Sequence, residues 1–266
     1  MKKIVSLLLI CVTLLTVLMF TGCGKVYTVE TIKKEGKLVV YTEAGFAPYE
    51  FIYDNKLVGV DVDVMTKVAE KLGVELDIHD VNFDTIVGAV QSGKAMVGAA
   101  GITITADRQK SVDFSHPYTK TEQYVIVKAD KAIPTVEDLK GKNIGVQQGT
   151  TSDILIDNLI KDGMLEGTTL TGYNTPALAA AALDKIDAVV TDKLTAQIIV
   201  KGSGDSLKTD KLLKADGNVA AEPEAYGYAV AKGSEELLAV INEVVDEMIA
   251  SGEISALEEK YNDMAN

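Results

Sequence analysis

An arginine that follows a run of small residues is the first group in this sequence with the chemistry of a binding site. Residues 96–101 are mostly small, and Thr103, Thr105 and Arg108 come soon after them. Such a strand lets a ligand approach the backbone closely, and a guanidinium can hold a carboxylate through two parallel hydrogen bonds. The segment indicates a carboxylate-binding site, although a surface arginine that closes a loop would give the same pattern.

A second site for an anion is indicated by residues 145–152, GVQQGTTS, which combine the end of a strand, a glycine turn and a helix start. The free N–H groups and the dipole of a helix start favour a negative charge. Gly149, Thr150 and Thr151 would supply backbone and hydroxyl donors there. A plain helix N-cap explains the same residues equally well.

Asp192 supplies the opposite charge. It ends residues 187–192, a strand by its pattern, and so lies at the carboxyl edge of a parallel sheet, where α/β folds bind ligands. The alternative is that it caps a helix over residues 194–200. An α-amino acid carries a carboxylate and an ammonium on one carbon, and a receptor must pair both because a buried unpaired charge is costly. These groups together have the chemistry of an amino-acid receptor.

Strand and helix patterns alternate from residue 38 onwards. The expected elements are strands at 38–42, 74–78, 96–101, 144–146, 187–191 and 226–231, and helices at 61–72, 83–92, 152–161, 194–200, from 135, from Pro176 and from Ser234. This order predicts parallel sheets with right-handed crossovers, and two such units exceed one small core, so we expect two lobes. Residues 202–217, rich in Gly, Ser, Asp and Lys, predict an exposed connection.

The block VGAAGITITADRQKSVDFSHPY, residues 97–118, resembles the signature of the family 3 extracellular solute-binding proteins, which are polar amino-acid receptors of ABC importers. GFAPYEF at 45–51 and GVDVDV at 59–64 also resemble motifs of that family. The resemblance implies an α/β, two-lobed periplasmic-binding-protein fold, each lobe a mostly parallel sheet flanked by helices.

The resemblance also implies how the chain is divided. Lobe 1 is expected to be discontinuous and to comprise residues 38–120 and 225–266, and lobe 2 residues 121–224. Two crossing segments, near residues 118–122 and 219–225, would act as the hinge.

The family assigns roles to positions that match in this chain. Arg108 would bind the α-carboxylate, with Thr150 and Thr151 facing it from the second lobe, and Asp192 would receive the α-ammonium. Gly101 and Thr103 would add a backbone carbonyl and a hydroxyl. Contacts to the ligand side chain would come from Glu43, Phe46, Phe83 and Gln147.

Some of these positions have other readings. Two aromatic rings can sandwich a planar guanidinium or amide, but Phe83 could equally be a core residue at a helix start. Asp61 and Asp63 are interpreted as helix-start residues that favour the dipole. Glu43 near the side-chain end favours a basic or glutamine-like ligand.

The function implied is a non-enzymatic receptor, a monomer without cofactor, that binds a free polar amino acid in an interlobe cleft and delivers it to an ABC permease. One alternative is an enzyme of the prephenate or arogenate dehydratase type on the same fold, since fold does not fix function. Another is a sensory ligand-binding domain that signals to a partner.

The first residues have the pattern of a lipoprotein signal. Lys2 and Lys3 precede an uncharged run at residues 4–20, and Phe20-Thr21-Gly22-Cys23 resembles a lipobox in which Phe20 replaces the usual leucine. We expect residues 1–22 to be a signal peptide, Cys23 to carry the lipid and residues 23–37 to be a polar tether. The protein would then lie at the outer face of the cytoplasmic membrane. An uncleaved anchor helix is the alternative.

Charge and composition argue against nucleic acid as a partner, and against a disulfide or a histidine-based metal site. The formal net charge of −13 argues against nucleic-acid binding and against an electrostatic membrane anchor, so membrane attachment would depend on lipid alone. Cys11 would leave with the signal, so no intrachain disulfide is expected. The two histidines, His79 and His116, lie in unrelated segments, so no histidine-based metal site is expected.

Overall fold

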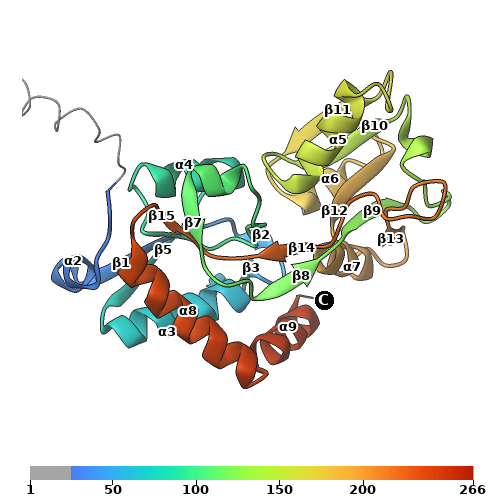
Figure 1. The fold of residues 1–266 in the computed structure, drawn as a ribbon. Coiled ribbons are helices and arrows are strands. Elements are labelled where there is room, and N and C mark those ends of the chain that lie inside the picture. The colour runs from blue at the N-terminus through green and yellow to red at the C-terminus, as the bar shows by residue number, and fades with distance from the viewer. Residues whose placement is uncertain (1–24, 266) are drawn as a thin grey trace, which may run out of the picture.

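Two α/β lobes lie side by side and are joined by two extended crossings in a computed structural model that describes residues 25–265 (Figure 1). Cys23 and the expected signal peptide lie outside the described residues. The first lobe contains α2 (Val29–Glu35), β1 (Lys37–Thr42), β2 (Gly45–Phe46), β3 (Glu50–Tyr53), β4 (Lys56–Val58), α3 (Val60–Leu72), β5 (Glu75–Asp80), α4 (Phe83–Gln91), β6 (Val97–Gly98), β7 (Val112–Phe114), β15 (Ala229–Ala231), α8 (Glu235–Ala250) and α9 (Glu253–Met264).

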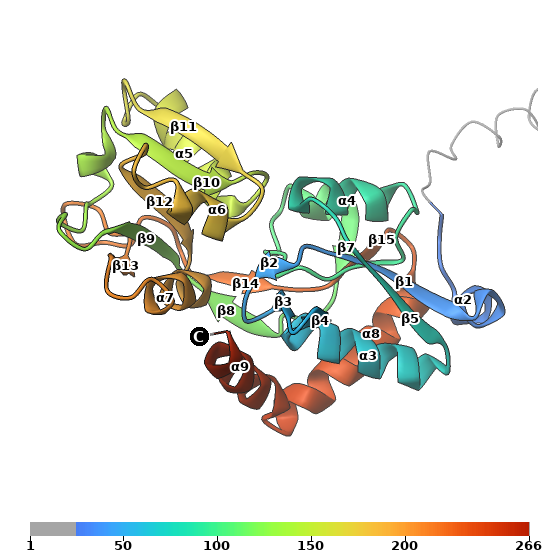
Figure 2. The ribbon, with the colours of Figure 1, turned by 180° about the vertical axis from the view of Figure 1, so that it is seen from behind.

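The second lobe is formed by one continuous stretch of chain. It contains β9 (Gln123–Lys128), β10 (Asn143–Gln147), α5 (Thr151–Lys161), β11 (Thr169–Tyr173), α6 (Pro176–Ala181), β12 (Ala188–Asp192), α7 (Lys193–Lys201) and β13 (Leu207–Lys211). Two short strands, β8 (Thr119–Thr121) and β14 (Glu224–Tyr226), run between the lobes and pair with each other in antiparallel register. The view from behind shows the same two crossings (Figure 2).

The two central sheets share one pattern. Their strand orders are β5-β1-β6-β15-β7 and β11-β10-β12-β9-β13. In each sheet, four strands run in one direction and one strand runs against its neighbours: β15 in the first sheet and β9 in the second. The expectation of mostly parallel sheets is therefore confirmed, and each sheet is mixed because it includes one reversed strand. The reason is topological, because β9 and β15 are the strands that follow the crossings β8 and β14.

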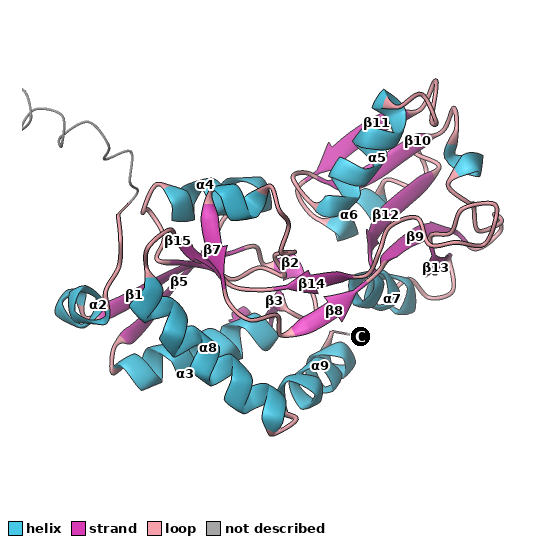
Figure 3. Cartoon of the chain, viewed as in Figure 1, coloured by secondary structure: helices cyan, strands magenta, loops and turns pink. Residues whose placement is uncertain are grey.

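Helices cover both faces of each sheet (Figure 3). In the first lobe, α4 packs on one face around Ile86 and Val90, while α3 and α8 pack on the other around Val64 and Ile241. In the second lobe, the strand β9 alternates, so that Val125 faces the core under α5 and Ile126 faces the core under α6 and α7. Packing in these cores holds the sheets in place, and with them the strand ends that carry the polar side chains.

The start of the chain differs from the expected tether. Residues 29–35 form helix α2, whose N-terminus has a capping box between Thr28 and Thr31. Ile32 is fully buried in the core of the first lobe, and Tyr27 donates from its hydroxyl to the Gly93 carbonyl at 2.7 Å. Two apolar side chains and this hydrogen bond dock the segment on the lobe, which a tether would not do.

Four local predictions are also corrected. Residues 202–217 include an edge strand, β13, which pairs with β9. The strand expected over 96–101 is limited to β6, and the strand expected over 226–231 divides into β14 and β15. The helix expected from residue 135 is a single 3-10 turn, Glu137–Leu139. Among residues 25–265, no helix has the length and hydrophobicity needed to cross a bilayer.

Candidate functional site

Arg108 lies between the two lobes, at the start of the 3-10 helix Arg108–Lys110 in the connection from β6 to β7. Its Nη1 donates to the Thr103 carbonyl at 2.8 Å, and its Nη2 donates to the Gly149 carbonyl of the second lobe at 2.9 Å. Its guanidinium lies over the Phe83 ring, 5.5 Å from the ring centroid. Burial lowers the pKa of Arg108, whereas Glu224 and Asp192 oppose that change. The cation is thus held in place by carbonyls and a ring, with two carboxylates nearby.

The start of helix α5 faces this arginine from the second lobe. Gly149, with φ of 76°, makes the turn from β10 into the helix, and a Cβ there would lie only 2.9 Å from Cβ of Asp84 in the first lobe. Glycine is therefore required for the lobes to approach. Thr150 is the N-cap residue, and its hydroxyl accepts from the Asp153 N–H and donates to the Gln147 carbonyl. Its hydroxyl therefore caps the helix.

Asp192 ends β12 and precedes α7, but its side chain does not cap that helix. Instead the carboxylate accepts hydrogen bonds from Gln123 Nε2, at 3.0 Å, and from the Tyr226 hydroxyl. Burial raises the pKa of Asp192 to about 7; Tyr226 opposes this, and the nearby charge of Glu224 adds to it. A cation beside Asp192 would restore its ionised form.

Glu43 and Gln147 meet across the lobes at the side-chain end of the predicted site. Gln147 Nε2 donates to Glu43 Oε2 at 2.9 Å and to the Asn174 carbonyl at 2.8 Å. Burial raises the pKa of Glu43 to about 7, and the hydrogen bond from Gln147 counteracts part of that shift. Phe46 is buried and stacks on Tyr49, with ring centroids 5.9 Å apart. It also limits the space at Gly101, where a Cβ would lie 2.8 Å from the Phe46 ring.

Most of the predicted residues are therefore brought together between the lobes. Phe83 contacts Arg108, and Phe46 packs against the Gly101 loop, so neither ring is free in the way a simple aromatic sandwich would need. The Thr103 and Thr151 hydroxyls both contact the carboxylate of Glu224.

Four residues of this region were missed or misread from the sequence. Gln123, Glu224 and Tyr226 lie on or beside the crossing strands β8 and β14, and contact the predicted residues. Asp61, interpreted as a dipole-favouring helix start, is fully buried at the start of α3. Its Oδ2 accepts from the Gly101 N–H at 2.9 Å, so it orients that loop. Contacts between such distant segments leave no local pattern in the sequence.

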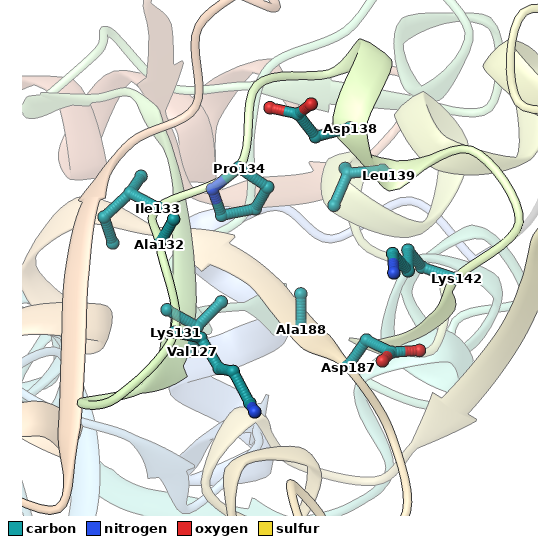
Figure 4. Close-up of a pocket in the computed structure, with 10 residues that line it drawn as sticks. All are labelled: Val127, Lys131, Ala132, Ile133, Pro134, Asp138, Leu139, Lys142, Asp187 and Ala188. Atoms are coloured by element: carbon teal, nitrogen blue, oxygen red, sulfur yellow. The ribbon is translucent and has the colours of Figure 1, made fainter.

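A separate pocket lies at the opposite edge of the second sheet (Figure 4). Its volume is about 290 Å³, and its lining includes Ala188 and Lys142, at the beginnings of β12 and β10. Gln147 and Asp192 end those same strands, so the pocket is not part of the interlobe region. Its walls are mostly aliphatic.

Comparison with known proteins agrees with this arrangement. L-cystine-binding protein TcyJ of Escherichia coli is 32% identical over 235 residues, which are 86% of this chain and 84% of that protein. Arginine-binding extracellular protein ArtP of Bacillus subtilis is 28% identical over 91% of both chains. The structure of the amino acid ABC transporter substrate-binding protein AbpA of Streptococcus pneumoniae, bound to L-arginine, superposes with a TM-score of 0.79 at 30% identity, covering 89% of this chain and 98% of that one.

The two-lobed fold of these proteins is thus the fold of this chain as well. The family model described as bacterial extracellular solute-binding proteins, family 3, matches residues 38–264. This match spans both lobes and the crossings between them. The chain therefore belongs to the bacterial extracellular solute-binding proteins of family 3.

Proposed function

We propose that the protein binds a free amino acid between its lobes and delivers it to an ABC permease. Arg108 would hold the α-carboxylate together with the N–H groups at the start of α5, and Asp192 would hold the α-ammonium. The observation that carries the proposal is the placement of this opposite pair: Arg108 comes from the first lobe, Asp192 from the second, and the Arg108 charge lowers the pKa of Asp192. A zwitterion placed between them would pair both charges.

The side-chain end favours a basic ligand. Glu43 is buried with a pKa raised to about 7, so a cation near it would both ionise it and pair with it. Arginine and lysine are expected to bind best, then glutamine and histidine. The arginine-bound AbpA structure supports a basic ligand, and TcyJ, named for L-cystine, shows that the ligand differs among relatives.

The lobes would close on the ligand about β8 and β14. We propose lobe 1 as residues 38–120 and 225–266, with helix α2 docked on it, and lobe 2 as residues 121–224. The contacts Glu43 to Gln147, Arg108 to Gly149 and Thr195 to Ala47 already join the lobes in this structure. A ligand that contacts both lobes would add to these interlobe contacts and so stabilise the closed form.

A lipid on Cys23 would keep the receptor at the outer face of the cytoplasmic membrane. The support is the lipobox-like segment and the extracellular character of the family. Cys23→Ser should move the protein from the membrane fraction to the soluble fraction without changing ligand affinity. A variant that still sediments with membranes would point to an uncleaved anchor helix.

The decisive experiment is a thermal-shift screen of the mature chain against the twenty amino acids, followed by calorimetry on the best binders. Binding raises the melting temperature as the ratio of ligand concentration to Kd grows. A rise with basic amino acids supports the proposal. No rise with any amino acid, together with turnover of prephenate or arogenate, would replace it by the enzymatic alternative.

A further inference from the structure

Glu224 joins the two lobes through one carboxylate oxygen. It lies on the crossing strand β14, opposite Thr121 of β8. Its Oε2 accepts from the Thr103 hydroxyl of the first lobe at 3.1 Å and from the Thr151 hydroxyl of the second lobe at 2.7 Å. Both hydroxyls belong to the predicted ligand site. A charged residue of the hinge is therefore part of the wall of that site.

Glu224 also lies beside Asp192. The Nε2 group of Gln123 is 3.0 Å from Oδ1 of Asp192 and 3.4 Å from Oε2 of Glu224, so one amide nitrogen serves two carboxylates. Like charges this close oppose ionisation, and Glu224 indeed contributes to the raised pKa of Asp192. Hydroxyl donors and the Arg108 charge offset part of this repulsion, and a cation between the two carboxylates would offset more of it.

A protonated amine matches these acceptors. It offers three N–H donors, and the acceptors lie close together: the Thr103 hydroxyl donates to Glu224, and Gln123 Nε2 donates to both Glu224 and Asp192. A ligand carboxylate would be repelled there by both acids and attracted instead to Arg108. Glu224 would therefore act on the ammonium end of the ligand, while its contact with Thr151 places it next to the carboxylate end.

We propose that Glu224 is a second carboxylate of the ammonium subsite, which makes binding depend on the protonated α-amine and favours ligands with a net positive charge. The inference rests on the proposed function, because Arg108 and Asp192 define where the amine lies. Arg108 and Asp192 pair with the carboxylate and the ammonium of a zwitterion. Glu224 then adds one further negative charge to the site. A ligand with a cationic side chain offsets that excess, and an acidic ligand adds to it.

The test compares Glu224→Gln with the wild type and with Glu222→Gln, which removes the same charge from an exposed position two residues away. The probes are L-arginine, L-lysine, L-histidine and L-glutamine, with the 2-hydroxy acid analogue of arginine as a ligand that lacks the ammonium. Glu224→Gln should weaken the tightest-binding amino acid by about tenfold, the order of one lost charge-assisted contact. It should weaken the 2-hydroxy acid less, and Glu222→Gln should change neither.

The unliganded protein supplies a second readout. Because Glu224→Gln removes repulsion from Asp192, the melting temperature without ligand should rise while affinity falls. A residue with only a structural role would lower both. Equal or tighter amino-acid binding by Glu224→Gln would overturn the inference, and tighter binding of the amino acid and the 2-hydroxy acid alike would show that Glu224 competes with the ligand carboxylate. Failure of the wild type to bind any of the twenty amino acids would overturn the proposed function as well.

Discussion

Glu43 and Gln147 join the two lobes through a hydrogen bond of 2.9 Å between Glu43 Oε2 and Gln147 Nε2. Glu43 lies just beyond β1 of the first sheet, and Gln147 ends β10 of the second. The bond therefore connects the carboxyl edges of two sheets, where α/β folds place their ligands. It also sets the charge at the end of the site that would receive the ligand side chain.

Glu43→Gln should reverse the preference of the site for basic ligands. The variant keeps the shape and one acceptor but removes the negative charge, so arginine should bind about tenfold more weakly while glutamine changes little. Competition calorimetry with arginine, lysine, glutamine, leucine and glutamate measures this order. If leucine or glutamate binds the wild type most tightly, the assignment of Glu43 to the side-chain end is wrong.

Replacing Arg108 should abolish most binding with little effect on folding. Arg108→Ala leaves a ligand carboxylate without its partner, which costs on the order of 2–5 kcal/mol of binding free energy. Arg108→Lys is the matched control, because it keeps the charge but loses the paired hydrogen bonds. Its ligand affinity should therefore lie between that of the wild type and that of Arg108→Ala. Near-wild-type affinity of Arg108→Ala by calorimetry would remove this residue from the site.

The sequence predicted the elements that position the site better than the contacts within it. The regular spacing of hydrophobic residues located β1, α3, α4, α5 and α7 to within a few residues. The edge strand β13 was missed because its residues 207–211 are largely polar and only half-buried. Charged edge strands are common, since they discourage pairing with other chains, and they look like loops in composition.

Contacts carried by the crossings could not be predicted locally. Glu224 is 121 residues from Thr103 in the chain, and the two meet only because β14 returns between the lobes. Asp61 was misread for a related reason. Helix starts commonly carry exposed acids, and only the packing shows that this one is buried against the Gly101 backbone.

Ile32 tests whether α2 is part of the folded lobe. Its side chain is fully buried, so Ile32→Ala should lower the free energy of unfolding by about 2–4 kcal/mol. Ligand affinity should stay the same, because α2 lies away from the crossings and the second lobe (Figure 1). Lys33→Ala, at an exposed position of the same helix, should change stability little. Denaturant unfolding measures the stability of both variants. Equal stability would indicate that residues 23–37 act as a tether and that α2 does not stabilise the lobe.

The buried acids predict an unusual dependence of stability on pH. Burial is the first cause in each case: it raises the pKa of Glu43 and of Asp192 to about 7 and that of Asp61 to about 6, and it raises the pKa of Glu50 well above its usual value. In the unfolded chain, such groups ionise near pH 4. Between these values the folded protein binds more protons than the unfolded chain.

Stability contributed by these groups should therefore be complete below about pH 4 and decline as pH rises through their folded-state pKa values. The unliganded protein should melt at a higher temperature at pH 5 than at pH 8, at constant ionic strength. Asp192→Asn should flatten part of this slope, and the exposed Glu222→Gln should not. Saturating ligand should flatten it as well, because an ammonium beside Asp192 favours the ionised carboxylate. A melting temperature that rises from pH 5 to pH 8 without ligand would show that these carboxyls are ionised and paired in the empty protein.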